Sequence, residues 1–259
     1  MERPVSDDSP LLIQRDGPVV RMTLNRPTRR NAMNEAMVER MDAAFADLKT
    51  DKLARVLVIS GAGGHFCAGL DLTEVGAPET LEEKTARQAE RNRRTGARFR
   101  TISELPQVVI AAVEGAAYAG GLGFVCAADI ALASASARFS APEVRRGLVP
   151  AQILPWLARR MGRSEAARLC LQGHVLDAAE AARVGLVHAV SDNLDAALAS
   201  AVSDILEGAP GALAETKALI AALGATVPEG YAAAGAESFA RRAASAEAAE
   251  GIASFRERR

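Results

Sequence analysis

The sequence has few aromatic residues, few cysteines and few histidines. Phe, Trp and Tyr make up 4% of its 259 residues, although 49% are apolar, so a sizeable core must be built mainly from small aliphatic side chains. Cys67, Cys126 and Cys170 are odd in number and far apart, which argues against a disulfide framework and fits a reducing cytoplasm. The histidines share no metal-ligand spacing with one another or with the cysteines, so no metal site is predicted.

An excess of one charge and long apolar runs are lacking too. The formal net charge is −1, so no strong field points to nucleic acid or to an anionic membrane surface. No apolar run approaches the ~20 residues that span a bilayer. Residues 1–10 are polar and do not resemble a secretion signal, and we expect them to be disordered. The length suits one α/β domain, or one domain with a small appendage.

Apolar runs alternate with helical patterns along the chain. Strands are expected over residues 19–24, 56–59, 108–113 and 129–133. Asn34 can cap a helix whose apolar residues recur at helical spacing. Residues 79–104 are helix-like but heavily charged, and the pattern is mostly helical from about residue 151. This alternation predicts an α/β fold with a mostly parallel sheet, and the long helical tail indicates packing or assembly.

Two glycine-bearing turns each follow an expected strand, at residues 66–72 and 114–123. Small residues let the backbone approach a substrate closely, and a helix beginning near Gly121 would aim free N–H groups at an anion. Read alone, such glycines more often only make tight turns. A dinucleotide site would need a third glycine, but the sequence has Phe66 and Cys126 at those positions. P-loop and nucleophile-elbow motifs are absent from the sequence.

The combination of segments resembles the enoyl-CoA hydratase/isomerase (crotonase) family from about residue 11 to residue 259. The resemblance is carried, in order, by Asn25-Arg26-Pro27, Asn31-Ala32-Met33, Phe66–Leu72, Val113–Asp129, Phe139–Glu143 with Gly147 and Pro150, Gly185–Val187, and Glu250–Arg259. It implies a crotonase-type, ClpP-like spiral of ββα units over residues 11–200. A C-terminal helical region over residues 201–259 would then serve trimerisation.

The resemblance also implies roles for individual residues. The backbone N–H groups of Leu70 and Gly120 would form an oxyanion hole for the thioester enolate, where one donor is worth ~3 kcal/mol in the transition state. Glu143 would transfer protons; without its motif, it would be taken for a member of a surface ion pair. The residues implied to contact coenzyme A are Arg26, Arg30, Ala68, Asp71 and Leu72. Taken alone, the two arginines would be ordinary surface charges.

Gly123 departs from the family pattern. Hydratases of the family commonly hold the attacking water with two glutamates, and the first would fall at this position. Its absence favours isomerisation by Glu143 alone, or hydration in which another polar group or the substrate orients the water. We expect the acyl group to occupy the space beside Gly123. Residues 144–153 nevertheless resemble the branch that hydrates glutaconyl-type esters, whose second carboxylate one arginine of segment 79–104 could bind. The alternative for these arginines is a solvated helix face.

The sequence therefore predicts an enoyl-CoA hydratase that needs no cofactor, since coenzyme A is part of its substrate. An enoyl-CoA isomerase using Glu143 is the second prediction, and a catalytically silent CoA-binding relative is an alternative of another class. We expect a cytoplasmic homotrimer or homohexamer that binds acyl-CoA, with no nucleic acid or membrane partner.

Overall fold

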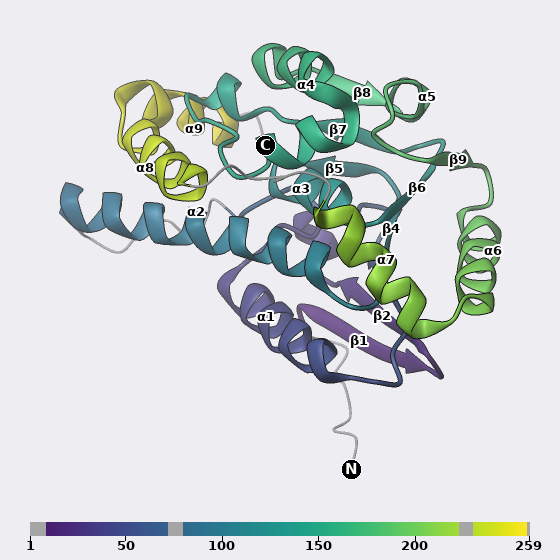
Figure 1. The fold of residues 1–259 in the computed structure, drawn as a ribbon. Helices are drawn as coiled ribbons and strands as arrows, with labels where there is room; N and C mark the ends of the chain where they lie inside the picture. The colour runs from purple at the N-terminus through teal and green to yellow at the C-terminus, as the bar shows by residue number, and fades with distance from the viewer. Residues whose placement is uncertain (1–8, 72–79, 223–229, 258–259) are drawn as a thin grey trace.

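The computed structural model describes residues 9–71, 80–222 and 230–257 (Figure 1). Its larger sheet has six strands in the order β1-β2-β3-β4-β6-β9. These are β1 (Leu11–Asp16), β2 (Val19–Leu24), β3 (Val56–Gly61), β4 (Val108–Val113), β6 (Ile130–Ser134) and β9 (Ala189–Ser191). Only the β1–β2 pair in this sheet is antiparallel. The prediction of a mostly parallel sheet is confirmed, and each expected strand is present.

A smaller sheet packs beside the first and contains β5 (Ala116–Tyr118), β7 (Arg138–Ser140) and β8 (Val175–Asp177) in the order β5-β7-β8. Strands β4 and β5 are followed by helix α3 (Gly120–Ala127), and strands β6 and β7 precede helix α4 (Leu154–Gln172). Each of these two units adds one strand to the larger sheet and one to the smaller sheet before its helix. Cys67, which follows β3, pairs with Ala117 of β5 in an isolated bridge, so the chain after β3 also reaches the smaller sheet. The repetition is the expected spiral of ββα units.

Capping groups in the sequence fix the starts of the long helices. The Asn34 side chain accepts a hydrogen bond from the Met37 N–H (3.0 Å) at the start of α1 (Glu35–Thr50), as predicted. Helix α2 (Leu81–Glu104) begins with a capping box in which Thr80 and Glu83 satisfy each other's backbone N–H groups. Helix α2 lies within the expected segment 79–104, and its buried side includes both polar and apolar side chains.

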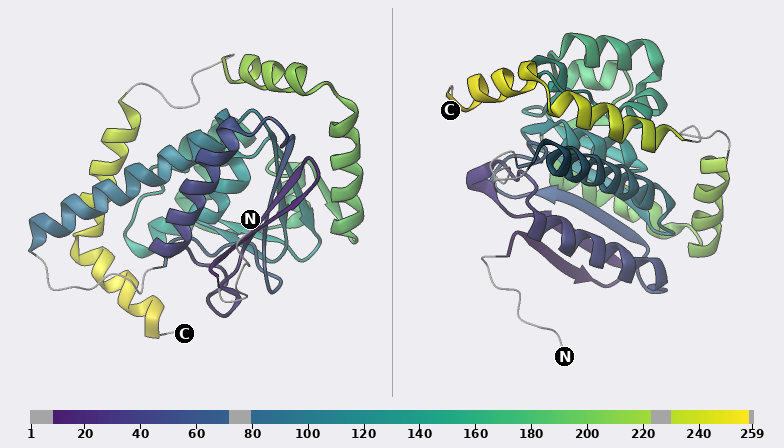
Figure 2. Two further views of the ribbon diagram at one scale, coloured as in Figure 1. Left: turned by 90° about the horizontal axis from the view of Figure 1, so that it is seen from below. Right: turned by 90° about the vertical axis from the view of Figure 1, so that its left-hand side faces the viewer.

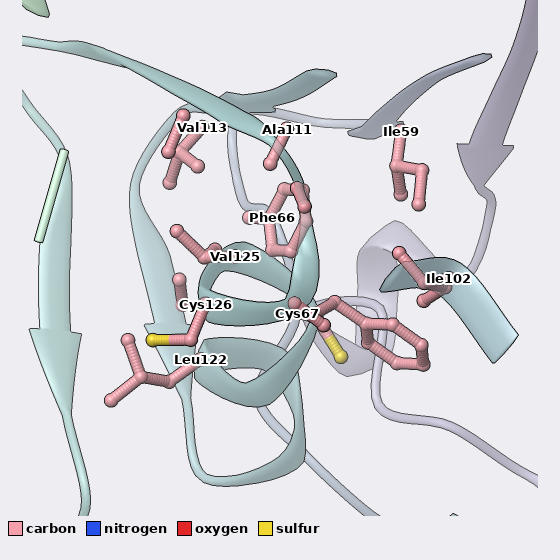
Figure 3. Close-up of a cluster of buried hydrophobic side chains, with 14 of the residues drawn as sticks. Ile59, Phe66, Cys67, Ile102, Ala111, Val113, Leu122, Val125 and Cys126 are labelled. Atoms are coloured by element: carbon pink, nitrogen blue, oxygen red, sulfur yellow. The ribbon is translucent and has the colours of Figure 1, made fainter. Parts of the chain in front are cut away.

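The main core lies between the sheets and surrounds α3, most of whose residues are buried. Figure 3 shows Leu122, Val125 and Cys126 of this helix among side chains from β3, β4 and the turn after β3. The outer face of the large sheet is covered by α6 (Leu194–Glu207), which buries Leu198 and Val202 there. The short helix α5 (Ala178–Arg183) joins β8 to the segment before β9. A helix buried on every side, such as α3, can support a rigid turn at its N-terminus.

The C-terminal helices are α7 (Pro210–Ala222), α8 (Tyr231–Ala243) and α9 (Ala246–Glu257). Helix α8 packs along α2, and α9 contacts the 3-10 helix η3 (Glu143–Arg146) (Figures 1 and 2). Helix α7 is anchored by Lys217, whose Nζ donates to the Gln107 carbonyl (2.9 Å) and lies 2.7 Å from the Asp129 carboxylate. Helices α8 and α9 therefore cover elements of the spiral core in the same chain. In the described part of the chain, no helix combines the length and apolar character needed to cross a bilayer.

Candidate active site

A cavity of about 540 Å³ opens between α2, the turns after β3 and β5, η3 with the segment that follows it, and helices α8 and α9. The predicted site residues that line it are Arg30, Ala68, Leu70, Asp71, Gly120 and Glu143. These positions span more than a hundred residues of sequence, and the spiral brings them to one place.

The two glycine-bearing turns touch each other at the cavity wall. Cys67 donates its N–H to the Ala116 carbonyl (2.9 Å) and accepts one from Tyr118 (2.9 Å). Gly69 has φ +95°, and a Cβ placed on it would lie 3.0 Å from the Ala119 Cβ and 3.5 Å from the Gly120 nitrogen. Only glycine adopts this conformation easily and permits so close an approach. The backbone at Leu70 is thereby placed beside the backbone at Gly120.

The N–H groups of Leu70 and Gly120 are available to a ligand. Met33 binds the residues on either side of Leu70, through its N–H to the Gly69 carbonyl (2.8 Å) and its carbonyl to the Asp71 N–H (2.9 Å). In a parallel bridge of this kind, the middle residue points its own N–H away from the partner. Gly120 is the first residue of α3, where helical N–H groups lack acceptors within the helix. Among the described residues, neither N–H donates to another backbone group.

Ala119 holds the second turn in a conformation that is rare for a residue with a side chain. Its φ is 49° and its ψ is −121°. Its own N–H donates to the Ser140 carbonyl (3.0 Å), which ties the turn to β7. Strained backbone of this sort persists where the surroundings determine it, and it frequently marks functional sites.

Glu143 begins η3 directly after Pro142 and is 8% exposed. Burial raises the pKa of its carboxyl group from an ordinary value of 4.5 to about 7, while its own backbone N–H and the charge of Arg146 oppose the shift. Its Oε2 has no hydrogen-bond partner among the described residues. A carboxyl group with these properties can both accept and donate a proton near neutral pH.

Phe99 of α2 fills the space beside Gly123. A Cβ on Gly123 would lie 2.2 Å from the Phe99 Cζ, and the Phe99 ring is fully buried. The ring packs edge-on against Phe124, with centroids 5.3 Å apart, and against Trp156 at 6.5 Å. The expectation that the acyl group occupies this space is therefore wrong, since an aromatic ring of the protein does.

The residues implied to contact coenzyme A divide into three groups. Arg30, Ala68 and Asp71 line the cavity. Arg26 is not among the lining residues; its guanidinium pairs with Asp71 (2.9 Å) and donates to the Ala32 carbonyl, which braces the wall from behind. Leu72 lies outside the described residues. Arg30 also fixes the wall, because its carbonyl accepts the Ala68 N–H (3.0 Å).

None of the described arginines of α2 lines the cavity. Arg94 and Arg98 pair with acidic residues of α1 at 2.8 Å and 2.6 Å, and Arg100 pairs with Glu104 on its own helix. The alternative that the sequence left open, a solvated helix face, fits Arg94 and Arg100, whereas Arg98 is buried against Asp42.

Sequence reasoning assigned no role to three residues that shape the site. Asn31 is fully buried and donates to the carbonyls of Ala62 (2.9 Å) and His65 (2.6 Å), which joins the segment after β2 to the turn after β3. Phe99 fills the space that a side chain at position 123 would occupy, and Asn92 lines the cavity from α2. Asn92 and Phe99 lie seven residues apart on one helical face, a spacing that marks a buried stripe even where some of its members are polar.

Comparisons with known proteins identify relatives along almost the whole chain. The family model described as enoyl-CoA hydratase/isomerase matches residues 14–259. A crystal structure of an enoyl-CoA hydratase from Mycobacterium avium is 35% identical, with a TM-score of 0.85 over 97% of this chain and 98% of that one. Pseudomonas aeruginosa AtuE is 38% identical, with a TM-score of 0.77 over 96% and 97% of the two chains.

Curated relatives match over a shorter stretch. A putative enoyl-CoA hydratase of Thermus thermophilus is 35% identical over 64% of each chain, and the 1,2-epoxyphenylacetyl-CoA isomerase of Escherichia coli is 34% identical over 63% of this chain and 62% of its own. Such alignments cover 54–66% of the relatives' length. With the family model spanning the spiral core and the C-terminal helices, the chain belongs to the enoyl-CoA hydratase/isomerase (crotonase) family and has its fold.

Proposed function

We propose that this enzyme is an enoyl-CoA hydratase, which adds water across the 2,3 double bond of an acyl-CoA thioester. The observation that carries the proposal is the meeting of three groups at one cavity: the N–H groups of Leu70 and Gly120 and the carboxyl group of Glu143. Two adjacent donors without acceptors suit a single oxygen atom that gains charge. A carboxyl group with a pKa near 7 suits a proton transfer.

The oxyanion hole would stabilise the enolate. When the oxygen of water bonds to C3 of the substrate, the double-bond electrons move toward the thioester carbonyl, and its oxygen becomes negative. Two preorganised backbone donors then bind the oxygen more strongly in the transition state than in the ground state. Each donor thereby raises the rate by roughly 10²–10³. The walls can remain small and uncharged because the backbone supplies the donors.

Glu143 would handle both protons. Its ionised form takes a proton from the attacking water as the C3–O bond forms, and the acid so produced gives a proton to C2 of the enolate. One molecule of water is consumed, and the carboxylate is regenerated. No cofactor is consumed, because coenzyme A is part of the substrate and stays bonded to the acyl group throughout the reaction. A pKa near 7 keeps both forms populated at neutral pH.

A second candidate function is enoyl-CoA isomerisation, in which Glu143 moves a proton between C4 and C2. The observation that favours it is the filled space at Gly123, which leaves no room for a second carboxylate to hold water. A silent CoA-binding relative would not need a buried carboxyl group with an unpaired oxygen. The near-neutral charge supports a protein without a nucleic-acid partner, and the free, buried cysteines support a cytoplasmic location.

The test is incubation with 2-enoyl- and 3-enoyl-CoA esters and analysis of the products by mass. A gain of one water supports hydration, a shifted double bond at unchanged mass supports isomerisation, and binding without either product supports the silent relative. Glu143→Gln should lower turnover by about 10²–10⁴ while acyl-CoA still binds. The matched control is Glu104→Gln at the exposed end of α2, which should change nothing.

A further inference from the structure

Asn92 presents an unpaired polar atom at a place that the proposed mechanism does not use. Its side chain lines the cavity although the residue is only 7% exposed. Its Oδ1 has no hydrogen-bond partner among the described residues, a condition that Glu143 shares within the same cavity. Buried polar atoms are paired in the great majority of cases, so an unpaired one on a residue that lines a cavity indicates a group supplied by the ligand.

The surroundings of Asn92 form a polar strip on one wall. Thr95 lies one helical turn further along the same face of α2 and also lines the cavity. Its hydroxyl donates to the Arg91 carbonyl (2.9 Å), which leaves the oxygen free to accept. Phe99 lies two turns, roughly 10 Å, from Asn92 and ends the strip with an apolar ring. The strip therefore covers one stretch of α2 and does not extend to the space beside Gly123.

The cavity is mostly apolar where the segment after η3 and the C-terminal helices line it. The apolar residues that line it from the segment after η3 and from the C-terminal helices are Leu148, Val149, Ile153, Phe239 and Ile252. Gln152 lies among them, but its Nε2 is already committed to the Ala232 carbonyl (3.0 Å). With the thioester oxygen at Leu70 and Gly120, these walls are left to the acyl group. An acyl group placed there meets both this apolar surface and Asn92.

We propose that Asn92 is a specificity-determining residue that hydrogen-bonds an uncharged oxygen-bearing group, a hydroxyl or a carbonyl, on the acyl chain of the thioester. The inference rests on the proposed action on enoyl-CoA esters and names their class. A carboxamide can serve either group, because rotation about its last bond exchanges its acceptor for its donor. No described arginine of α2 lines the cavity, so this wall offers a neutral partner and not a cation.

The experiment compares matched pairs of substrates. The ω-hydroxylated but-2-enoyl-, pent-2-enoyl- and hex-2-enoyl-CoA esters are each assayed against the parent ester of equal length, and the readout is the ratio of the two kcat/KM values. We expect the wild type to favour at least one hydroxylated ester roughly tenfold, the range of one buried hydrogen bond to an uncharged group. Asn92→Leu and Asn92→Ala should both abolish that preference, and the ratio does not depend on how much of each variant folds.

Gln107→Leu is the matched control, since it removes a buried carboxamide that also has an unpaired oxygen but lies away from the cavity. It should retain the wild-type ratio. The inference is overturned if the wild type favours none of the hydroxylated esters, or if the Asn92 variants lose kcat/KM equally on both members of a pair, as a residue that holds the attacking water would. A wild type that converts no ester at all contradicts the proposed function instead.

Discussion

Glu143, the proposed acid and base, lowers the stability of the folded state when it is ionised. Its pKa is about 7 in the folded protein and near 4.5 when the chain is unfolded. Between these values the folded state holds more protons than the unfolded state, so the free energy of unfolding falls as pH rises through this window. Below about pH 4 both states are protonated and the effect vanishes; above pH 7 it is complete, at roughly 3 kcal/mol.

Glu143→Gln should therefore be more stable than the wild type at pH 8 and about equal to it at pH 4. The glutamine keeps the size of the side chain but cannot ionise, which removes the pH-dependent penalty. Urea unfolding at the two pH values measures the difference directly. Equal stability of the two proteins at pH 8 would show that the carboxyl group is not desolvated in solution, and the assignment of a raised pKa would then be wrong.

Gly123 offers a second test at the scale of one residue. Gly123→Glu places a side chain within 2.2 Å of the Phe99 ring and buries a carboxylate, so this variant should be severely destabilised or insoluble. Adding Phe99→Ala opens the space. The double variant should be more stable than the sum of the two single changes predicts, and it should hydrate but-2-enoyl-CoA faster than Phe99→Ala alone.

A thermodynamic cycle of the wild type, the two single variants and the double variant measures this coupling. Additive effects would mean that Phe99 does not occupy the space beside Gly123. Coupled stability without faster hydration would mean that the added carboxylate fits but cannot orient water.

At the scale of single elements, the sequence predicted most of the local structure. Asn34 caps α1 as expected, and the apolar runs became β2, β3, β4 and β6. The expectation missed β1, which lies at the sheet edge with mixed burial, and the short strands β5, β7, β8 and β9, which have three residues each. Local patterns of this kind carry no signal of which strands become neighbours.

The site was predictable only where a motif carried it. Leu70, Gly120 and Glu143 line one cavity, and the family resemblance had singled out all three. The positions of Phe99 and Asn92 at the site could not be predicted. They depend on how α2 packs against α3 and the C-terminal helices, and a local sequence pattern does not contain that tertiary packing. Charge dominated the pattern of α2 and hid its buried stripe.

The start of α3 is the element on which the proposed oxyanion hole depends. Gly120→Pro removes the N–H at a position where proline suits a helix, and should lower turnover by roughly 10²–10³. Gly120→Ala is its control, because it keeps the donor and the close contact of its Cβ, at 2.9 Å, is with the flexible end of Met33. Steady-state kinetics with thermal denaturation of both variants decides the matter. A proline variant that folds and retains near-normal turnover would remove Gly120 from the hole.

At the scale of the whole molecule, the C-terminal helices contribute to the cavity of their own chain through Phe239 and Ile252. Exposed apolar side chains remain on α7, where Leu219 and Ile220 are 69% and 53% exposed. We predict a homotrimer or homohexamer, in which such surface would be covered. Light scattering at micromolar concentration measures the mass, and a monomer would contradict the prediction.

The burial of Cys67, in the first of the two touching turns, has a practical consequence. The thiol is fully buried, and burial raises its pKa to about 12, so alkylating reagents that require an exposed thiolate cannot reach it in the closed protein. Its labelling rate therefore reports how often the turns separate. The other two cysteines are also buried, with thiol pKa values raised to about 12. Peptide mapping can therefore compare the labelling rates of the three cysteines, each of which reports local opening around its own thiol. A thioester bound across the turns should lower the labelling rate of Cys67 more than the rates of the other two cysteines.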